Sequence, residues 1–157
     1  FIPEGASKIY DLQEPTSKMS KSGDNPKGLI NLLDPPKTSA KRIKSAVTDD
    51  LGVVAFDREK QPGVSNLLVI QSALTGEKID ALVEKYTDKG YGHLKVDTAD
   101  ALEAFTTPLK SRYDELMADR GELERLLAKG AEAASEIAEP LVEKVYEAVG
   151  FLPRLRK

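Results

Sequence analysis

The chain has 157 residues, of which 40% are hydrophobic and 31% are charged. This length suits one domain, or one domain and part of another, with a buried core and a water-compatible surface. The formal net charge of −3 excludes a surface that is basic overall, so any nucleic-acid site must be a local patch.

The chain contains no cysteine, which excludes disulfides and thiolate metal sites and is consistent with a reducing cytoplasm. No apolar run approaches the roughly 20 residues of a membrane helix, so we expect no membrane span. The chain begins with Phe1 rather than Met, and we interpret it as a fragment of a longer protein.

The N-terminal stretch predicts a strand end followed by a polar loop. Residues 7–12 alternate polar and apolar side chains before Pro15, which is typical of an extended segment. Residues 18–22, with the sequence KMSKS, then lie between Pro15 and Pro26 and are too polar to form a core. We refer to residues 18–22 as the KMSKS loop.

Apolar periodicity from residue 28 onward predicts a helical body. Residues 48–63 are expected to form a packed connector. The expected helices are 40–47, 66–75, 79–86, 98–119 and a last helix that continues from Gly121 to Gly150.

Hydroxyl and carboxyl side chains before three of these helices suggest N-caps, because such groups accept hydrogen bonds from the free N–H groups of a first turn. Pro108 predicts a kink or break near residues 106–107, and Pro140 predicts a kink in the last helix. The expected caps are Thr38 or Ser39, then Ser65, then Asp97 or Thr98.

The KMSKS loop carries side chains suited to binding a polyphosphate. When pyrophosphate leaves a nucleotide, negative charge builds on the departing oxygens, and cations aimed at them lower the barrier. Lys18 and Lys21 can supply those cations, the two serines and the backbone N–H groups can donate hydrogen bonds, and Met19 can anchor the loop by burial. For a generic Lys-Ser loop, however, a solvated surface linker is the more common explanation.

The complete string KMSKS resembles the second signature motif of class I aminoacyl-tRNA synthetases. A chance match of five residues is expected on the order of once in ten thousand chains of this length. Further blocks, in the right order along nearly the whole chain, are similar to the tryptophanyl-tRNA synthetases: Leu12–Thr16, Leu32–Pro35, Ile43–Asp49, Gly63–Leu68, Tyr91–Lys95, Gly130–Glu132 and Val145–Phe151.

The resemblance implies a mainly α fold. A helical bundle would follow the last strand and KMSKS loop of a class I Rossmann-type catalytic domain. Residues 1–26 would then end the catalytic nucleotide-binding domain. Residues 27–157 would form a helical, tRNA anticodon-binding region, whose last helix packs back on the catalytic domain.

The resemblance also implies ATP-dependent activation of L-tryptophan and its transfer to tRNA(Trp). ATP would enter as a substrate with Mg²⁺, with no tightly bound cofactor and no metal site on this chain, in a cytoplasmic homodimer. Lys18 and Lys21 would be the catalytic residues, with Lys21 the first choice for transition-state stabilisation. The ATP-binding residues would be Ile9, Lys18, Met19, Ser20, Lys21 and Ser22.

Basic clusters indicate where tRNA phosphates could bind, and the foremost candidates are Lys41, Arg42 and Lys44. Tyrosines could stack on unpaired bases. For Tyr86, Tyr91 and Tyr113, however, core packing is the favoured interpretation. For the single histidine, His93, a structural or packing role is favoured.

The family's other signature, a His-containing motif, and the tryptophan pocket are absent from these 157 residues. We therefore expect the isolated chain to be inactive, with L-tryptophan and ATP bound through a missing N-terminal half. Two alternatives remain open: a tyrosyl-tRNA synthetase fragment, and a non-catalytic RNA-binding helical module that has kept a phosphate-binding loop.

Overall fold

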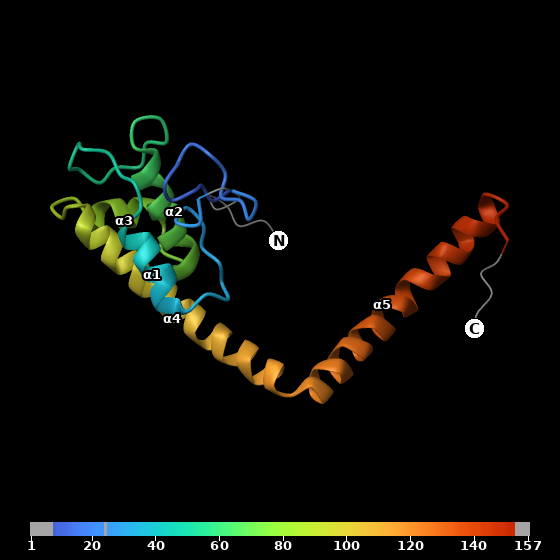
Figure 1. Cartoon of the computed structure of the whole chain (residues 1–157). Coiled ribbons are helices and arrows are strands. Elements are labelled where there is room, and N and C mark those ends of the chain that lie inside the picture. The colour runs from blue at the N-terminus through green and yellow to red at the C-terminus, as the bar shows by residue number, and fades with distance from the viewer. Residues whose placement is uncertain (1–7, 24, 153–157) are drawn as a thin grey trace. The chain divides into compact units, whose positions relative to one another are not determined.

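The computed structural model describes residues 8–23 and 25–152. These residues form five α-helices and no strand, which confirms the mainly α fold (Figure 1). The helices are α1 (Pro36–Lys44), α2 (Pro62–Thr75), α3 (Ile79–Lys85), α4 (Tyr91–Ala118) and α5 (Arg120–Ala148). No helix of the described ranges is both long and apolar enough to cross a membrane.

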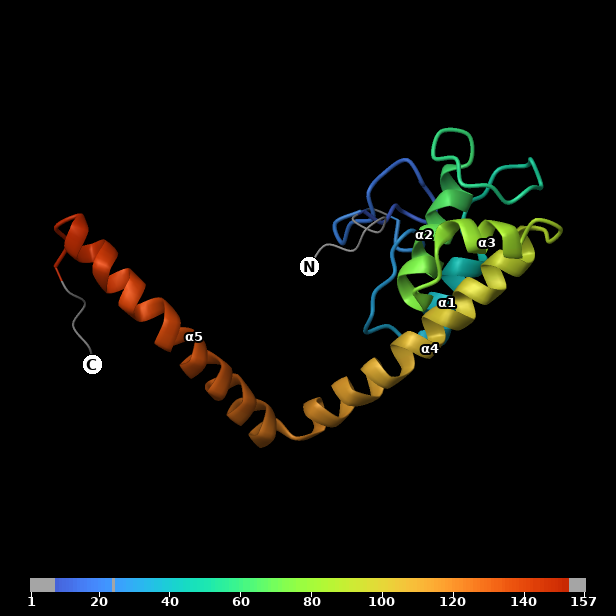
Figure 2. The same ribbon diagram turned by 180° about the vertical axis from the view of Figure 1, so that it is seen from behind.

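The chain divides into two compact units, Phe1–Tyr113 and Asp114–Lys157. In the first unit, α1, α2, α3 and the N-terminal part of α4 gather beside the loop segments (Figures 1 and 2). Helix α2 is central, because every residue from Gly63 to Gln71 is buried. Its core partners include Leu12 before the loop, Ile43 on α1, Leu82 on α3, Leu94 on α4 and Tyr86.

The expected N-caps are wrong for α1, α2 and α4. Helices α1 and α2 begin about one turn earlier than predicted, each with a proline in the first turn and no side-chain cap. Proline is favoured there because its missing N–H has no helical partner to lose. The residues predicted as caps, Ser39, Ser65 and Thr98, instead lie inside helices as buried side chains whose hydroxyls have no hydrogen-bond partner among the described residues.

Helix α4 is longer than expected at its start and does not break at Thr106–Thr107. The chain remains helical through Pro108 to Ala118. The Thr106 and Thr107 hydroxyls donate to the carbonyls of Leu102 and Glu103, at 2.8 and 2.7 Å, within the turn that precedes the proline. The interruption comes instead at Asp119, whose carboxylate accepts from the Glu122 N–H (2.9 Å) and caps α5.

The second unit is built around α5, which has no buried residue. Phe151 packs edge-to-face on Tyr146, with ring centroids 5.7 Å apart. The apolar stripe predicted for this helix is solvent-exposed, with relative exposures of 64% for Leu127, 80% for Ile137 and 65% for Leu141.

Candidate functional site

The KMSKS loop begins at a short antiparallel contact with the segment before it. Tyr10 and Lys18 form an isolated β-bridge, where the sequence predicted a strand end. The Met19 N–H donates to the Ile9 carbonyl (3.1 Å), and the Asp11 N–H donates to the Ser17 carbonyl (2.9 Å). The bridge therefore places Ile9 directly beside Met19, two of the predicted ATP-binding residues.

A buried asparagine on α2 holds the other edge of this segment. The Tyr10 N–H donates to Asn66 Oδ1 (2.9 Å), and Asn66 Nδ2 donates to the Tyr10 carbonyl (2.8 Å). The amide thus satisfies both backbone groups of Tyr10, as a neighbouring strand would. Sequence reasoning missed Asn66, and the only signal was a polar side chain in an otherwise apolar helix.

The loop presents its polar side chains to solvent, whereas its apolar side chain is partly buried. Met19 packs against the core, as predicted, whereas both lysines and both serines are exposed. Ser20 Oγ lies 3.0 Å from Ser22 Oγ and accepts from the Ser22 N–H (3.3 Å), which gives the tip a compact turn. Within the described ranges neither lysine forms an ion pair, so both ammonium groups remain available to an anionic ligand.

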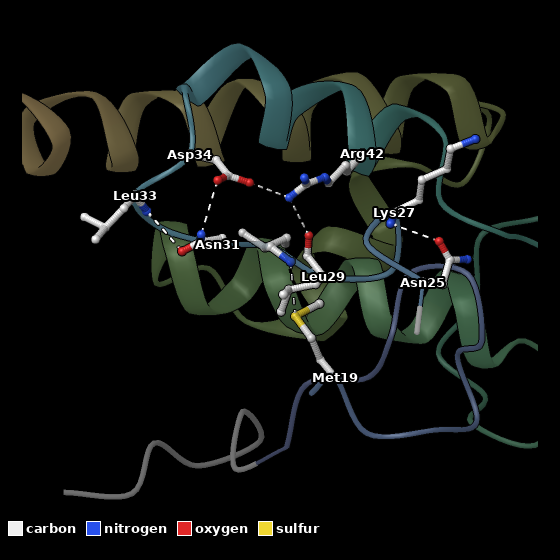
Figure 3. Close-up of polar contacts among 9 residues, drawn as sticks. Met19, Asn25, Lys27, Leu29, Asn31, Leu33, Asp34 and Arg42 are labelled. Carbon is white, nitrogen blue, oxygen red and sulfur yellow. Dashed lines mark hydrogen bonds and ion pairs between the residues drawn. The ribbon is translucent and has the colours of Figure 1, made fainter. Parts of the chain in front are cut away.

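The segment after the loop, residues 28–34, runs between Met19 of the loop and Arg42 on α1 (Figure 3). The Leu12 N–H donates to the Gly28 carbonyl (3.0 Å), and a Cβ at Gly28 would overlap the Asp11 carboxylate. That carboxylate accepts from the N–H groups of Gln13 (2.8 Å) and Glu14 (3.0 Å), so it shapes the turn that leads into the loop. Glycine is needed here for close approach rather than for an unusual backbone angle.

The three basic candidates on α1 are placed differently. Lys41 and Lys44 are exposed. Arg42 is half-buried, and its Nη1 donates to Asp34 Oδ2 (2.7 Å) and to the Leu29 carbonyl (2.9 Å) (Figure 3). Arg42 therefore points into the protein, toward the segment after the KMSKS loop.

The core interpretation is confirmed for Tyr86. Its ring is fully buried, and its hydroxyl accepts from Gln71 Nε2 and donates to Asp97 Oδ2, both at 2.8 Å. Burial raises the pKa of Tyr86 to about 12, and the nearby Asp97 carboxylate adds to the rise. Tyr113 is exposed, at 37%, so the core interpretation is wrong for Tyr113. His93 is also exposed, which excludes packing in the core, while a structural role for it stays a prediction.

Tyr91 joins a polar cluster that fixes the connector between α1 and α2. Its hydroxyl donates to Asp49 Oδ1, and Gln61 Nε2 donates to the same oxygen (3.2 Å) and to the Val53 carbonyl (2.8 Å). Burial alone would raise the pKa of Asp49, but the hydrogen bonds from Tyr91, Gln61 and the Leu51 N–H outweigh it and lower that pKa. Burial and the Asp49 carboxylate raise the pKa of Tyr91.

A small cavity of about 200 Å³ lies beside the bridge, between Tyr10, Arg58, Pro62 and Asn66. The Arg58 guanidinium lies 5.7 Å from the centre of the Tyr10 ring and 5.6 Å from that of Phe56. Sequence reasoning did not single out Arg58. No group of three or more acidic or histidine side chains suited to a metal ion occurs in the part of the chain that the structure describes.

The loop thus has two exposed lysines, is anchored by a partly buried methionine and is followed by a helical body, which is the arrangement expected of a class I synthetase motif. A family model described as tRNA synthetases class I (W and Y) matches residues 3–107. Because this match covers well over half of the chain, the chain belongs to that family.

The similar proteins are tryptophan–tRNA ligases. The chain is 73% identical over 157 residues to the one from Corynebacterium efficiens and 55% identical over 154 residues to the one from Mycobacterium leprae, covering 99% and 98% of this chain. In each case it spans 45% of the relative's length. The resemblance to tryptophanyl-tRNA synthetases is confirmed.

Two solved structures of similar fold are also tryptophanyl-tRNA synthetases. The crystal structure of tryptophanyl-tRNA synthetase from Mycoplasma pneumoniae superposes with a TM-score of 0.85 at 28% identity, over 96% of this chain and 47% of that one. The enzyme from Campylobacter jejuni, complexed with ADP and tryptophan, superposes with a TM-score of 0.63 at 28% identity, over 92% of this chain and 44% of that one.

Proposed function

We propose that this chain is the part of a tryptophan–tRNA ligase that supplies the pyrophosphate-binding loop and tRNA-binding helices. The full protein would activate L-tryptophan with ATP, release pyrophosphate and transfer the tryptophanyl group to tRNA(Trp). The observation that carries the proposal is 73% identity to a tryptophan–tRNA ligase over nearly the whole chain. An intact, solvent-exposed KMSKS loop supports it.

The loop's geometry suits the loss of pyrophosphate. With Met19 seated in the body, Lys18 and Lys21 lie on an exposed turn, where their flexible stems can follow the departing phosphates. Ser20 and Ser22 add hydroxyl donors, and the Ile9 backbone lies at the base of the loop to contact adenosine. ATP would enter as its Mg²⁺ complex, so the ion belongs to the substrate, and the lysines neutralise charge that the ion does not.

The assignment extends to the two domains. Residues 1–26 would complete the catalytic nucleotide-binding domain, and residues 27–157 would form the tRNA-binding region. Lys41 and Lys44 can reach RNA phosphates from the exposed side of α1, whereas Arg42 is already held by Asp34. The exposed stripe of α5 would pack on the catalytic domain of a cytoplasmic homodimer.

The test is amino-acid-dependent ATP–pyrophosphate exchange by the full-length protein that contains this chain. We expect exchange with tryptophan and not with tyrosine. Lys21→Ala should lower turnover about 100-fold, with a smaller effect on tryptophan affinity, because the lysine acts on developing charge.

Lys129→Ala on α5 is the matched control and should leave exchange unchanged. Exchange with tyrosine alone would transfer the assignment to the tyrosyl enzymes, and exchange with neither amino acid would overturn the ligase proposal. The 157-residue chain should show no exchange, because it lacks the other signature motif and the tryptophan pocket.

A further inference from the structure

One peptide unit links α1 to the KMSKS loop. The Leu29–Ile30 peptide accepts a hydrogen bond on its oxygen from Arg42 Nη1 (2.9 Å), and its N–H donates to Met19 Sδ (3.5 Å) (Figure 3). Because both groups belong to the same rigid plane, a movement of one end rotates the other. Hydrogen bonds on the two sides of one amide also polarise each other.

Arg42 is held firmly enough to orient that plane. The same Nη1 donates to Asp34 Oδ2 at 2.7 Å, the short length expected of a charge-assisted bond. Asp34 is itself fixed, since its other oxygen accepts from Asn31 Nδ2 (3.2 Å) and its N–H donates to the Asn31 carbonyl (3.1 Å). The arginine and aspartate side chains are only 20% and 25% exposed, so solvent screens their attraction less than at an open surface.

Met19 is the part of the loop that this linkage reaches. It stands between Lys18 and Ser20, its own N–H is fixed to Ile9, and its side chain packs on the core. The hydrogen bond from its N–H to Ile9 and the contact of its sulfur with the Ile30 N–H both hold the loop against the body, so the place of Met19 affects where the two flanking side chains emerge.

We infer that Arg42 is a positioning residue for the KMSKS loop, acting through the Leu29–Ile30 peptide and Met19. The inference rests on the proposed function, because it assigns a role within the same nucleotide site. Helix α1 also carries the exposed Lys41 and Lys44. An anion that shifts α1 would consequently shift the loop, and nucleotide binding at the loop would affect α1 in return.

The kinetic test compares Arg42→Leu with Arg42→Lys in the full-length protein, by tryptophan-dependent pyrophosphate exchange. Arg42→Leu should raise the KM for ATP about fivefold and leave the KM for tryptophan unchanged, because only the loop is displaced. Arg42→Lys should have a KM for ATP close to that of the unmodified protein, since an ammonium group can still donate to the Leu29 carbonyl. Arg125→Leu breaks a similar arginine–carboxylate pair on α5 and should change neither constant.

Met19→Leu tests the pathway, because it keeps the apolar side chain and removes the sulfur acceptor. Combined with Arg42→Leu, it should raise the KM for ATP by less than the product of the two single effects. Purely multiplicative effects, or an unchanged KM for ATP in a folded Arg42→Leu protein, would overturn the inference. Absence of exchange by the unmodified protein would instead overturn the proposed function.

A second measurement needs no activity and uses this chain as it stands. The chain has two methionines, Met19 in the first unit and Met117 in the second. In a methyl NMR spectrum, Arg42→Leu should shift the Met19 signal and leave the Met117 signal in place. If both signals stay where they are in the unmodified chain, Arg42 does not position Met19, whatever the kinetics show.

Discussion

The two units carry apolar patterns of similar helical periodicity and use them differently. In the first unit the apolar residues of α2 are enclosed by α1, α3, α4 and the segments around the KMSKS loop. In the second unit the stripe on α5 remains exposed, and no residue of that helix is buried. Periodicity therefore reveals which face of a helix is apolar, whereas burial depends on what else the chain brings to that face.

The difference matters for the candidate site. Met19, which anchors the loop, packs against the core of the first unit. The buried Asn66 of the same unit holds Tyr10 by hydrogen bonds. Helix α5 itself contributes no buried residue to such a support. We therefore expect changes in the first unit's core to reach the loop.

The largest difference between the two units should appear when one leucine of each is truncated. Leu67→Ala removes a fully buried side chain from α2 and should lower the free energy of unfolding of the first unit by about 2–5 kcal/mol. Leu127→Ala, at a position that is 64% exposed, should change it by less than about 0.5 kcal/mol. Urea unfolding followed by tyrosine fluorescence measures both. Equal losses would show that α5 belongs to the same cooperative core.

Two glycines should respond in opposite directions. A Cβ at Gly63 would overlap the Val47 carbonyl oxygen, so Gly63→Ala should destabilise the first unit by about 1–3 kcal/mol. Gly130 has open space around it inside α5, so Gly130→Ala should stabilise that helix by about 0.5–1 kcal/mol. Thermal melts by far-UV circular dichroism report both, and a stabilising Gly63→Ala would contradict the close approach of α2 to Val47.

The smallest effect concerns a buried hydroxyl. Tyr86→Phe should cost about 1 kcal/mol, because Gln71 and Asp97 lose a shared partner. Tyr146→Phe on α5 keeps its ring contact with Phe151 and should have no measurable effect.

The Tyr86 hydroxyl also predicts a pH dependence. Its folded-state pKa is raised from 10.0 to about 12, so the unfolded chain releases this proton first. The stability that the protonated Tyr86 hydroxyl contributes to the folded chain is fully present below pH 10 and is lost as the pH rises toward 12. Across that pH range the free energy of unfolding should therefore fall more steeply with pH for the unmodified chain than for Tyr86→Phe. Parallel curves would contradict a raised pKa.

Sequence reasoning succeeded where the signal is local. The polar character of the KMSKS loop, the helical periodicity and the packing of Met19 against the core could all be predicted, because each depends on residue type and spacing along the chain. The helix starts could not be predicted from the hydroxyl residues, since Ser39, Ser65 and Thr98 are drawn into the core with the helices that carry them. The prolines at 36 and 62 were the better signal, because proline suits a first turn whatever surrounds it.

Contacts between distant segments were beyond such reasoning. Arg42 counted as one more surface cation on a basic helix, yet it is the one that turns inward to Asp34 and Leu29. Nothing in the sequence indicates that the Asn66 side chain hydrogen-bonds both backbone groups of Tyr10, which lies 56 positions earlier. Tyr113 shows the converse, because it was expected in the core and is exposed.

The family, the helical class and the chemistry of the loop follow from the sequence alone, because these depend on which groups the chain carries and how they are spaced. Folding is needed to know that Arg42 turns inward while Lys41 and Lys44 are exposed, which apolar stripe is buried, and which segment supports the loop. Those outcomes depend on which segments meet across long separations, and a hydrogen bond such as that from Arg42 to the Leu29 carbonyl exists only after the chain has folded.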